Sequence, residues 1–229
     1  MHPDPSVVLL DVNETLSDTS SLPARFEEAG FPGDLARPWF TTLLRDGFAL
    51  AAAGGSRSFA AVGADALRTV LHGAGSPGPV EPAERDRAVD HVLASFAGFP
   101  LHADVAPGLR LLRAGGRRRL VTLTNGSRGG SEELLSAGGV RSEVGAVLSV
   151  EDAATWKPGP AAYRYALDGC GAAAADVLMV AVHPWDVHGA AAAGMRTAWI
   201  DRDGTPYPRS LTPPTLRATG LVDLAGQLS

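Results

Sequence analysis

Cysteine and lysine each occur only once in this sequence of 229 residues. Cys170 is the one cysteine, so no disulfide can form within the chain and a cysteine-based metal cluster is excluded. Lys157 is the one lysine, although lysine and arginine together number 20. A lysine kept in so arginine-rich a sequence either serves chemistry that needs a compact ammonium group or stands there by chance.

The sequence also lacks a long apolar run and a large excess of one charge. No apolar stretch approaches the roughly 20 residues that span a membrane, and the start, MHPDPSVVLL, does not have the pattern of a signal peptide. The net charge is -5, and the one basic cluster, residues 117–119, is typical of a solvated turn. We therefore expect a cytoplasmic protein that binds a small-molecule substrate, with neither nucleic acid nor a membrane as partner.

Short runs of Val, Leu and Ile without polar alternation recur along the chain. They lie at 7–11, 120–124, 146–150, 177–182 and 197–200. Such runs are typical of strands buried on both faces of a parallel sheet. Helical stretches follow at 108–115, 130–138, 159–169 and 185–194. This alternation predicts an α/β fold with a Rossmann-like, doubly wound parallel sheet.

The interval between the first two predicted strands is too long for one crossover connection. It exceeds 100 residues and contains helical patterns separated by Gly and Pro, with little that resembles a strand. We therefore predict a helical cap domain, residues 18–97, inserted after the first strand. Residues 1–17 and 98–229 are then expected to form the core.

Polar side chains follow four of the predicted strands. They are Asp11, Thr15, Thr124, Asn125, Lys157, His183, Trp185 and Asp186. Ligands of open parallel sheets bind beyond the carboxyl ends of the strands, where these residues would meet. Each alone has a structural explanation, as a helix cap, a turn or a surface residue. Together they predict a catalytic site.

The order and spacing of these residues resemble a known family. Asp11 with Thr15, Thr124–Asn125, Lys157–Pro158 and Asp186 resemble the four motifs of the haloacid dehalogenase-like hydrolases over nearly the whole chain. Within that superfamily, the chain is most similar to the type II 2-haloacid dehalogenases. The loop DVNETLSD, Tyr163 and the segment HPWDVHGA carry this closer resemblance.

The resemblance implies a reaction and five catalytic residues. The Asp11 carboxylate would attack the halogen-bearing carbon of a 2-haloalkanoate and form an aspartyl ester, which water then hydrolyses. Lys157 would stabilise the carboxylate, and Thr15 and Thr124 would orient it. Asp186 would hold Lys157 and help to orient the water.

Further residues are expected to surround the substrate. They are Asn13, Asn125, Arg45, Tyr163, His183 and Trp185. Dehalogenases of this type carry a halide-binding arginine directly after a tryptophan of the cap, but here Phe40 follows Trp39. Arg45, about one helical turn further on, is the nearest substitute, or is simply a solvated helix residue.

Other positions near the motifs also depart from the dehalogenase pattern. His183 replaces an asparagine, and it could bind the substrate, tune Asp186 or pack beside Pro184. In the first loop, Asn13 replaces an aromatic residue and Glu14 a small one.

Two positions argue against phosphate chemistry. Asn13 stands where phosphatases of the superfamily have a general-acid aspartate, and an amide cannot donate a proton at neutral pH. Val182 stands where they have an acidic ligand of Mg²⁺. We therefore expect a hydrolase without metal or other cofactor, as a possible homodimer like its relatives. The alternatives are a Mg²⁺-dependent phosphatase of a small phosphorylated metabolite and a non-catalytic binding protein with a vestigial site.

Overall fold

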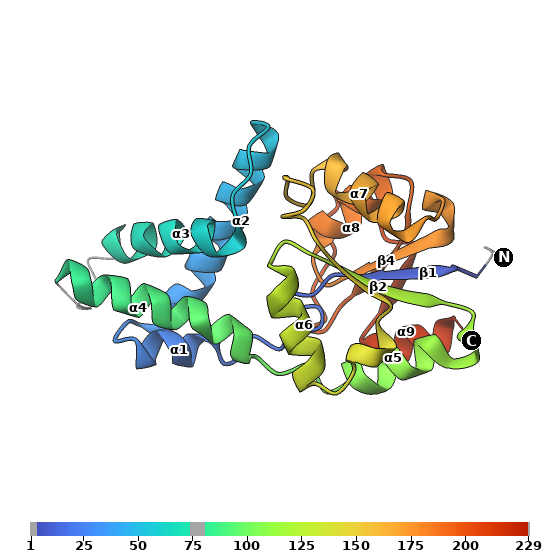
Figure 1. Cartoon of the computed structure of the whole chain (residues 1–229), viewed down its shortest axis with the longest axis horizontal. Coiled ribbons are helices and arrows are strands. Elements are labelled where there is room, and N and C mark those ends of the chain that lie inside the picture. Colours follow the sequence, from blue (N-terminus) through green and yellow to red (C-terminus); the bar gives the residue numbers. More distant parts are fainter. Residues whose placement is uncertain (1–3, 74–80, 229) are drawn as a thin grey trace.

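A computed structural model describes residues 4–73 and 81–228 (Figure 1). Within these residues, six parallel strands form one sheet in the order β3-β2-β1-β4-β5-β6. The strands are β1 (Val7–Leu10), β2 (Arg119–Thr124), β3 (Ala146–Ser149), β4 (Val177–Ala181), β5 (Arg196–Ile200) and β6 (Leu216–Ala218). In the central strand, Leu10 pairs with Thr122 of β2 and with Val180 of β4. The carboxyl ends of β1, β2 and β4 therefore lie at one edge.

Helices cover both faces of the sheet. One face packs against α5 (Val105–Arg113), α6 (Arg128–Ala137) and α9 (Leu221–Gln227), and the other against α7 (Pro160–Cys170) and α8 (Pro184–Ala192). In β1, Val8 and Leu10 belong to the first core, whereas Val7 and Leu9 belong to the second. Because all four side chains are buried, the strand has no polar alternation.

The chain between β1 and α5 forms a helical unit beside the sheet (Figure 1). Its helices are α1 (Leu22–Glu28), α2 (Ala36–Ala52), α3 (Phe59–Gly73) and α4 (Pro82–Ala94). They enclose their own core around Trp39, whose indole N–H donates to the Gly63 carbonyl at 2.9 Å. Where the chain enters and leaves this unit, Ser17 pairs with Leu101 in an isolated antiparallel bridge.

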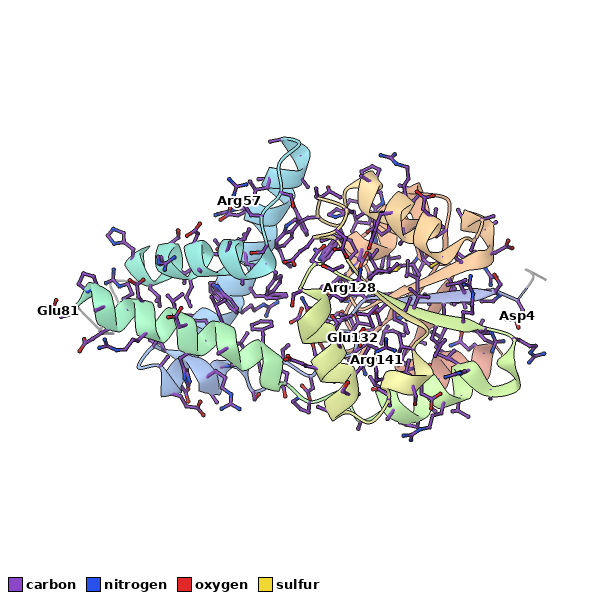
Figure 2. All side chains as sticks on the ribbon, in the orientation of Figure 1. Asp4, Arg57, Glu81, Arg128, Glu132 and Arg141 are labelled. Carbon is purple, nitrogen blue, oxygen red and sulfur yellow. The ribbon has the colours of Figure 1, made fainter. Side chains whose placement is uncertain are left out.

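One residue from outside this unit belongs to its core. Trp156, in the loop after β3, is fully buried there and stacks on Phe59 with ring centroids 5.9 Å apart. Its indole N–H donates to the carbonyl of Arg57, which lies in the cap between α2 and α3 (Figure 2), at 2.8 Å. Gly47 leaves the space for the indole, because a Cβ there would lie 2.3 Å from the ring.

The predicted fold class, a parallel α/β core with a helical cap, is confirmed. The sequence did not indicate β6, which is three residues long, contains Arg217 and therefore has no apolar run. Helix α5 begins at Val105, before the predicted start, and Pro107 lies in its first turn, where a missing N–H costs nothing. The boundaries 18 and 97 stay a prediction. Residues 1–3, 74–80 and 229 of the predicted domains lie outside the described residues.

Short 3₁₀ turns complete the connections. They are η1 (Gly33–Leu35), η2 (Ser95–Gly98), η3 (Ala114–Gly116), η4 (Arg141–Glu143) and η5 (Ala174–Asp176). None of the helices in the described ranges is long and apolar enough to cross a membrane.

Candidate active site

Asp11 lies directly beyond β1 at the carboxyl edge of the sheet. Its N–H donates to the carbonyl of Val180 at 3.0 Å, so the backbone still follows the strand and its position is fixed. The side chain is 4% exposed. Its Oδ2 accepts a hydrogen bond of 2.6 Å from Thr15, whose Oγ1 accepts from the N–H of Val182 at 3.1 Å. That second bond orients the Thr15 hydroxyl so that its hydrogen points to Asp11.

Lys157 reaches the same carboxylate from the loop after β3. Its fully buried Nζ lies 2.7 Å from Asp11 Oδ1, 2.6 Å from Asp186 Oδ2 and 2.9 Å from the carbonyl of Leu123. These acceptors use all three N–H bonds of the ammonium group. Asn125 holds the backbone, because its Oδ1 accepts from the Lys157 N–H at 2.9 Å and its Nδ2 donates to the Lys157 carbonyl at 3.3 Å.

Asp186, in the first turn of α8, is the second buried carboxylate. Its Oδ1 accepts a hydrogen bond of 2.7 Å from the hydroxyl of Tyr163 on α7. Burial raises the pKa of Tyr163 well above its ordinary value, and the neighbouring Asp186 adds to the rise. The phenol therefore stays protonated and remains a hydrogen-bond donor.

The buried charges of Asp11, Lys157 and Asp186 shift one another's pKa values. Burial alone would raise the pKa of Asp11, but the charge of Lys157 and the contact with His183 outweigh it and lower that pKa. Burial would lower the pKa of Lys157, yet Asp11 and Asp186 raise it. For Asp186, burial raises the pKa despite the attraction of Lys157, and the charge of Asp11 raises it further. Asp11 is thus an ionised carboxylate at neutral pH, with Lys157 as its counter-ion.

His183 lies between two carboxylates. Its Nδ1 is 3.3 Å from Asp11 Oδ2, and its Nε2 is 2.8 Å from Glu14 Oε2. The ring stacks on Trp185, with centroids 4.9 Å apart, and faces Phe40 of the cap. Burial alone would lower the pKa of His183, but the bonds to Asp11 and Glu14 raise it to about 9. The imidazole is therefore protonated at neutral pH.

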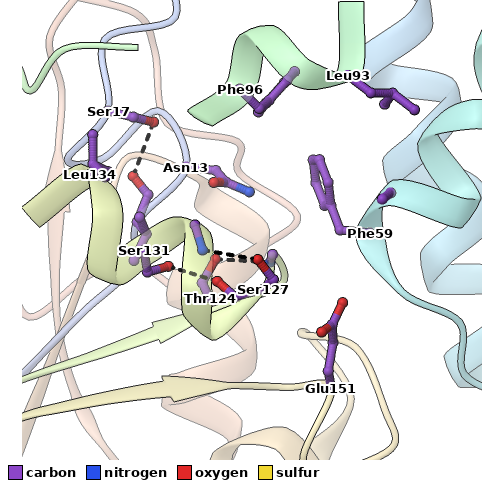
Figure 3. Close-up of a pocket in the computed structure, with 14 residues that line it drawn as sticks. Asn13, Ser17, Phe59, Leu93, Phe96, Thr124, Ser127, Ser131, Leu134 and Glu151 are labelled. Atoms are coloured by element: carbon purple, nitrogen blue, oxygen red, sulfur yellow. Dashed lines mark hydrogen bonds between the residues drawn. The ribbon is translucent and has the colours of Figure 1, made fainter. Parts of the chain in front are cut away.

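A cavity of about 200 Å³ opens beside the Asp11 loop, between the sheet and the cap (Figure 3). The sheet side contributes mainly polar groups, among them Asn13, Thr124 and Ser127, whereas the cap contributes the apolar side chains of Phe59 and Phe96. Among the described residues that line it, Glu151 alone carries a charge. Core and cap thus enclose one small space.

The structure connects most of the site residues that the sequence predicts. Asp11, Thr15, Lys157, Asp186, Tyr163 and His183 form one hydrogen-bonded network. Asn125 joins it through the backbone of Lys157, Asn13 and Thr124 line the cavity, and Trp185 packs on His183. The roles of these residues stay predictions.

Arg45 does not join this network. Its side chain is 65% exposed and its guanidinium pairs with Asp46 at 2.8 Å. The structure adds Glu14, which was not among the candidates, although its replacement of a small residue was the available signal. His183 contacts Asp11 and Glu14 rather than Asp186.

The donor set does not fit a divalent metal ion. Mg²⁺ needs several hard oxygen ligands, but Oδ1 of Asp11 and Oδ2 of Asp186 already accept from the ammonium group of Lys157. Val182 brings an isopropyl group to the end of β4. In residues 4–73 and 81–228, no three His, Cys, Asp or Glu side chains are grouped as a metal site would require.

A buried carboxylate, threonine and lysine at the edge of a parallel sheet, below a helical cap, define the class of protein. The chain belongs to the haloacid dehalogenase-like hydrolase family, whose model matches residues 5–194.

Three proteins similar to this chain are all named as dehalogenases. The chain is 38% identical to haloacetate dehalogenase H-2 of Moraxella sp. (strain B), over 44% of this chain and 45% of that protein, less than half its length. It is 28% identical to the (S)-2-haloacid dehalogenase of Pseudomonas sp. (strain YL), over 93% and 90% of the two chains. The crystal structure of the L-2-haloacid dehalogenase RSc1362 superposes with a TM-score of 0.90 at 29% identity, covering 99% of each chain. The predicted resemblance to the 2-haloacid dehalogenases is confirmed.

Proposed function

We propose that this hydrolase is a dehalogenase of small 2-haloalkanoic acids that acts through an aspartyl ester and needs no metal ion. The buried bridge from Asp11 through Lys157 to Asp186 carries the proposal. It provides an ionised carboxylate whose counter-ion is an ammonium group. Such a carboxylate can displace a halide, which leaves as an anion and needs neither a proton nor a metal ion.

The first step is a substitution at carbon. Two hydrogen bonds, from Thr15 and His183, occupy Oδ2 of Asp11. Among the described residues, Lys157 is the one donor to Oδ1, so this oxygen keeps a free lone pair. Oδ1 forms a bond to C2 of the substrate while the carbon–halogen bond breaks and the halide takes its electron pair. The product of this step is an ester between Asp11 and the alkanoate.

The second step is hydrolysis of that ester. The oxygen of a water molecule bonds to Cγ of Asp11, and the Cγ–Oδ1 bond then breaks. One proton of the water passes to the leaving alkoxide, which departs as the 2-hydroxy acid, and the other is released to solvent, so that the carboxylate is restored. Asp186 is the nearest buried carboxylate, held by Lys157 and Tyr163, and it orients the water.

The cavity favours a small substrate. Its volume of about 200 Å³ suits an acid of a few carbon atoms. The amide of Asn13 and the hydroxyls of Thr124 and Ser127 can donate to the substrate carboxylate, while Phe59 and Phe96 cover the carbon–halogen bond and exclude water. A cytoplasmic location and a homodimer, both expected from the sequence, complete the proposal.

Halide release tests the function. Haloacetates and 2-halopropionates are incubated with the protein, with and without a chelator, and free halide is measured. We expect release that the chelator does not reduce and that Asp11→Asn abolishes. Asp90→Asn, which changes an exposed aspartate of α4, should behave as the wild type.

Isotope labelling tests the ester. After one turnover in water labelled with ¹⁸O, the label should appear in the peptide that contains Asp11. Label that enters only the product would contradict an ester on Asp11. Mg²⁺-stimulated hydrolysis of an aryl phosphate, without halide release from any haloacid, would instead support the phosphatase.

A further inference from the structure

In the reaction described so far, His183 serves only to occupy Oδ2 of Asp11, and Glu14 has no role. His183 borders Asp11 on the side away from Lys157, because the imidazole contacts Oδ2 and the ammonium contacts Oδ1. Glu14 then contacts the far nitrogen of the imidazole at 2.8 Å. Asp11, His183 and Glu14 thus form a row of three side chains in contact.

The protonation state of His183 follows from its neighbours. An ionised carboxylate is an acceptor only, and His183 has one at each nitrogen. Only the imidazolium form has an N–H for both. The pKa of about 9 agrees with this assignment. The Nδ1–H therefore points at Oδ2 of Asp11.

The loop around Glu14 is built to hold this contact. Glu14 has φ of 61°, in the left-handed region that a residue with a Cβ seldom adopts. Its N–H donates to Ser17 Oγ at 3.1 Å, and its carbonyl oxygen lies 3.1 Å from Nε2 of His102. Such strained residues persist only where the surroundings fix them, and they gather at functional sites.

The ring of His183 is also fixed from the sides. It stacks on Trp185 at an interplanar angle of 26° and faces Phe40 of α2 at 28°, with centroids 4.9 and 6.5 Å away. Its side chain is 13% exposed. The imidazolium is thus oriented before any substrate binds, which is what electrostatic stabilisation of a transition state requires.

We infer that His183 is a catalytic residue of the ester-hydrolysis step and that Glu14 positions it. The inference rests on the proposed function. With Oδ1 in the ester, Oδ2 is the carbonyl oxygen. When water bonds to Cγ, the electron pair of the carbonyl moves onto Oδ2. Thr15 and His183 donate to this oxygen, so they stabilise its charge until the Cγ–Oδ1 bond breaks and the carbonyl re-forms.

Single-turnover measurements separate this role from all earlier steps. Excess enzyme is mixed with 2-chloropropionate or chloroacetate, halide release gives the rate of ester formation, and mass spectrometry of the intact protein follows the ester. In His183→Leu, which has no N–H, halide release should stay within about threefold of the wild type, while ester decay should slow by about 10²-fold, the usual effect of removing one such donor. His183→Asn, whose amide N–H can stand close to the position of Nδ1, should recover part of the loss.

Glu14→Gln tests the positioning role. The amide keeps the size of the side chain and still accepts a hydrogen bond, but it removes the charge that holds the imidazolium. Ester decay should slow by about 10-fold with KM unchanged, whereas a merely structural contact would leave ester decay at its wild-type rate. His188→Leu is the control matched to His183→Leu, because His188 lies on α8, the helix that begins directly after His183, and contacts Thr212 away from the site.

The outcomes are distinct. Ester decay at the wild-type rate in His183→Leu would overturn the inference, and so would an equal loss of halide release and ester decay, since His183 would then act before the ester. Circular dichroism identifies a variant that fails to fold. If the His183 variants do not fold, the rate of ester decay in Glu14→Gln tests the inference. Absence of halide release from the wild type would overturn the proposed function itself, and the inference with it.

Discussion

The edge of the sheet and the facing cap hold opposite kinds of residue on the two sides of the site. The sheet edge contributes buried charges, Asp11, Lys157 and Asp186, each with charged or polar partners at 2.6–2.7 Å. The cap contributes rings, Phe59 and Phe96, that belong to an aromatic cluster. The two sides therefore have different tasks. The sheet edge holds the reacting groups in fixed positions, and the cap limits the size of the neighbouring cavity and excludes water from it.

The largest expected effect concerns the buried lysine. Lys157→Met leaves Asp11 and Asp186 buried without a counter-ion, so we expect loss of about 3–5 kcal/mol in the free energy of unfolding. Halide release should fall by at least about 10³-fold. Urea unfolding and halide assays measure both quantities, with Arg164→Met, an exposed cation of α7, as the control. A stable, active Lys157→Met variant would mean that the buried charges of the sheet edge are not needed for stability or for catalysis.

His183, between the sheet edge and the cap, gives a dependence of stability on pH. Its pKa in the folded protein, about 9, exceeds the value of 6.5 for an unperturbed histidine. Its contribution to stability is therefore fully present below pH 6.5 and is lost as the pH rises towards 9, by at most about 3 kcal/mol. Urea unfolding at pH 6 and at pH 9 should show this decline in the wild type and a smaller one in His183→Asn. Equal declines would contradict a raised pKa.

Substitution of an aromatic residue on the cap side of the cavity should affect substrate binding more than turnover. Phe96 packs on Phe59 and Trp39 with centroids 5.5 Å away in both cases. Phe96→Leu removes ring contacts worth about 1 kcal/mol and widens the cavity without touching a charge. We expect KM to rise a few-fold while kcat stays within about threefold. A fall of kcat similar to that of Lys157→Met would mean that the cap also holds reacting groups.

The smallest effect is expected at Arg45. Because its side chain is 65% exposed and paired with Asp46, Arg45→Ala should leave kcat and KM for a haloacid within about twofold of the wild type. Steady-state kinetics with bromide and chloride leaving groups provides the test. A marked rise of KM would restore Arg45 as the substitute for the missing cap arginine.

The sequence predicts strand ends better than side-chain contacts. Uninterrupted apolar runs identify buried strands, and parallel strands bring Asp11 and Lys157 to one edge, so their meeting is foreseeable. Spacing does not say which way a side chain turns. For this reason the sequence does not indicate the Glu14 contact, and it offers Arg45, which the structure leaves outside the network. The Glu14 contact depends on a backbone conformation with φ of 61°, which no residue pattern indicated.

Trp156 connects the core of the cap to Lys157, the residue that contacts Asp11. Its indole is buried in the cap, and the next peptide bond leads to Lys157, whose ammonium keeps Asp11 ionised. A displacement of the cap that withdraws this indole pulls on the lysine within a distance of one residue. The packing of the cap therefore helps to fix the backbone from which the counter-ion of Asp11 extends.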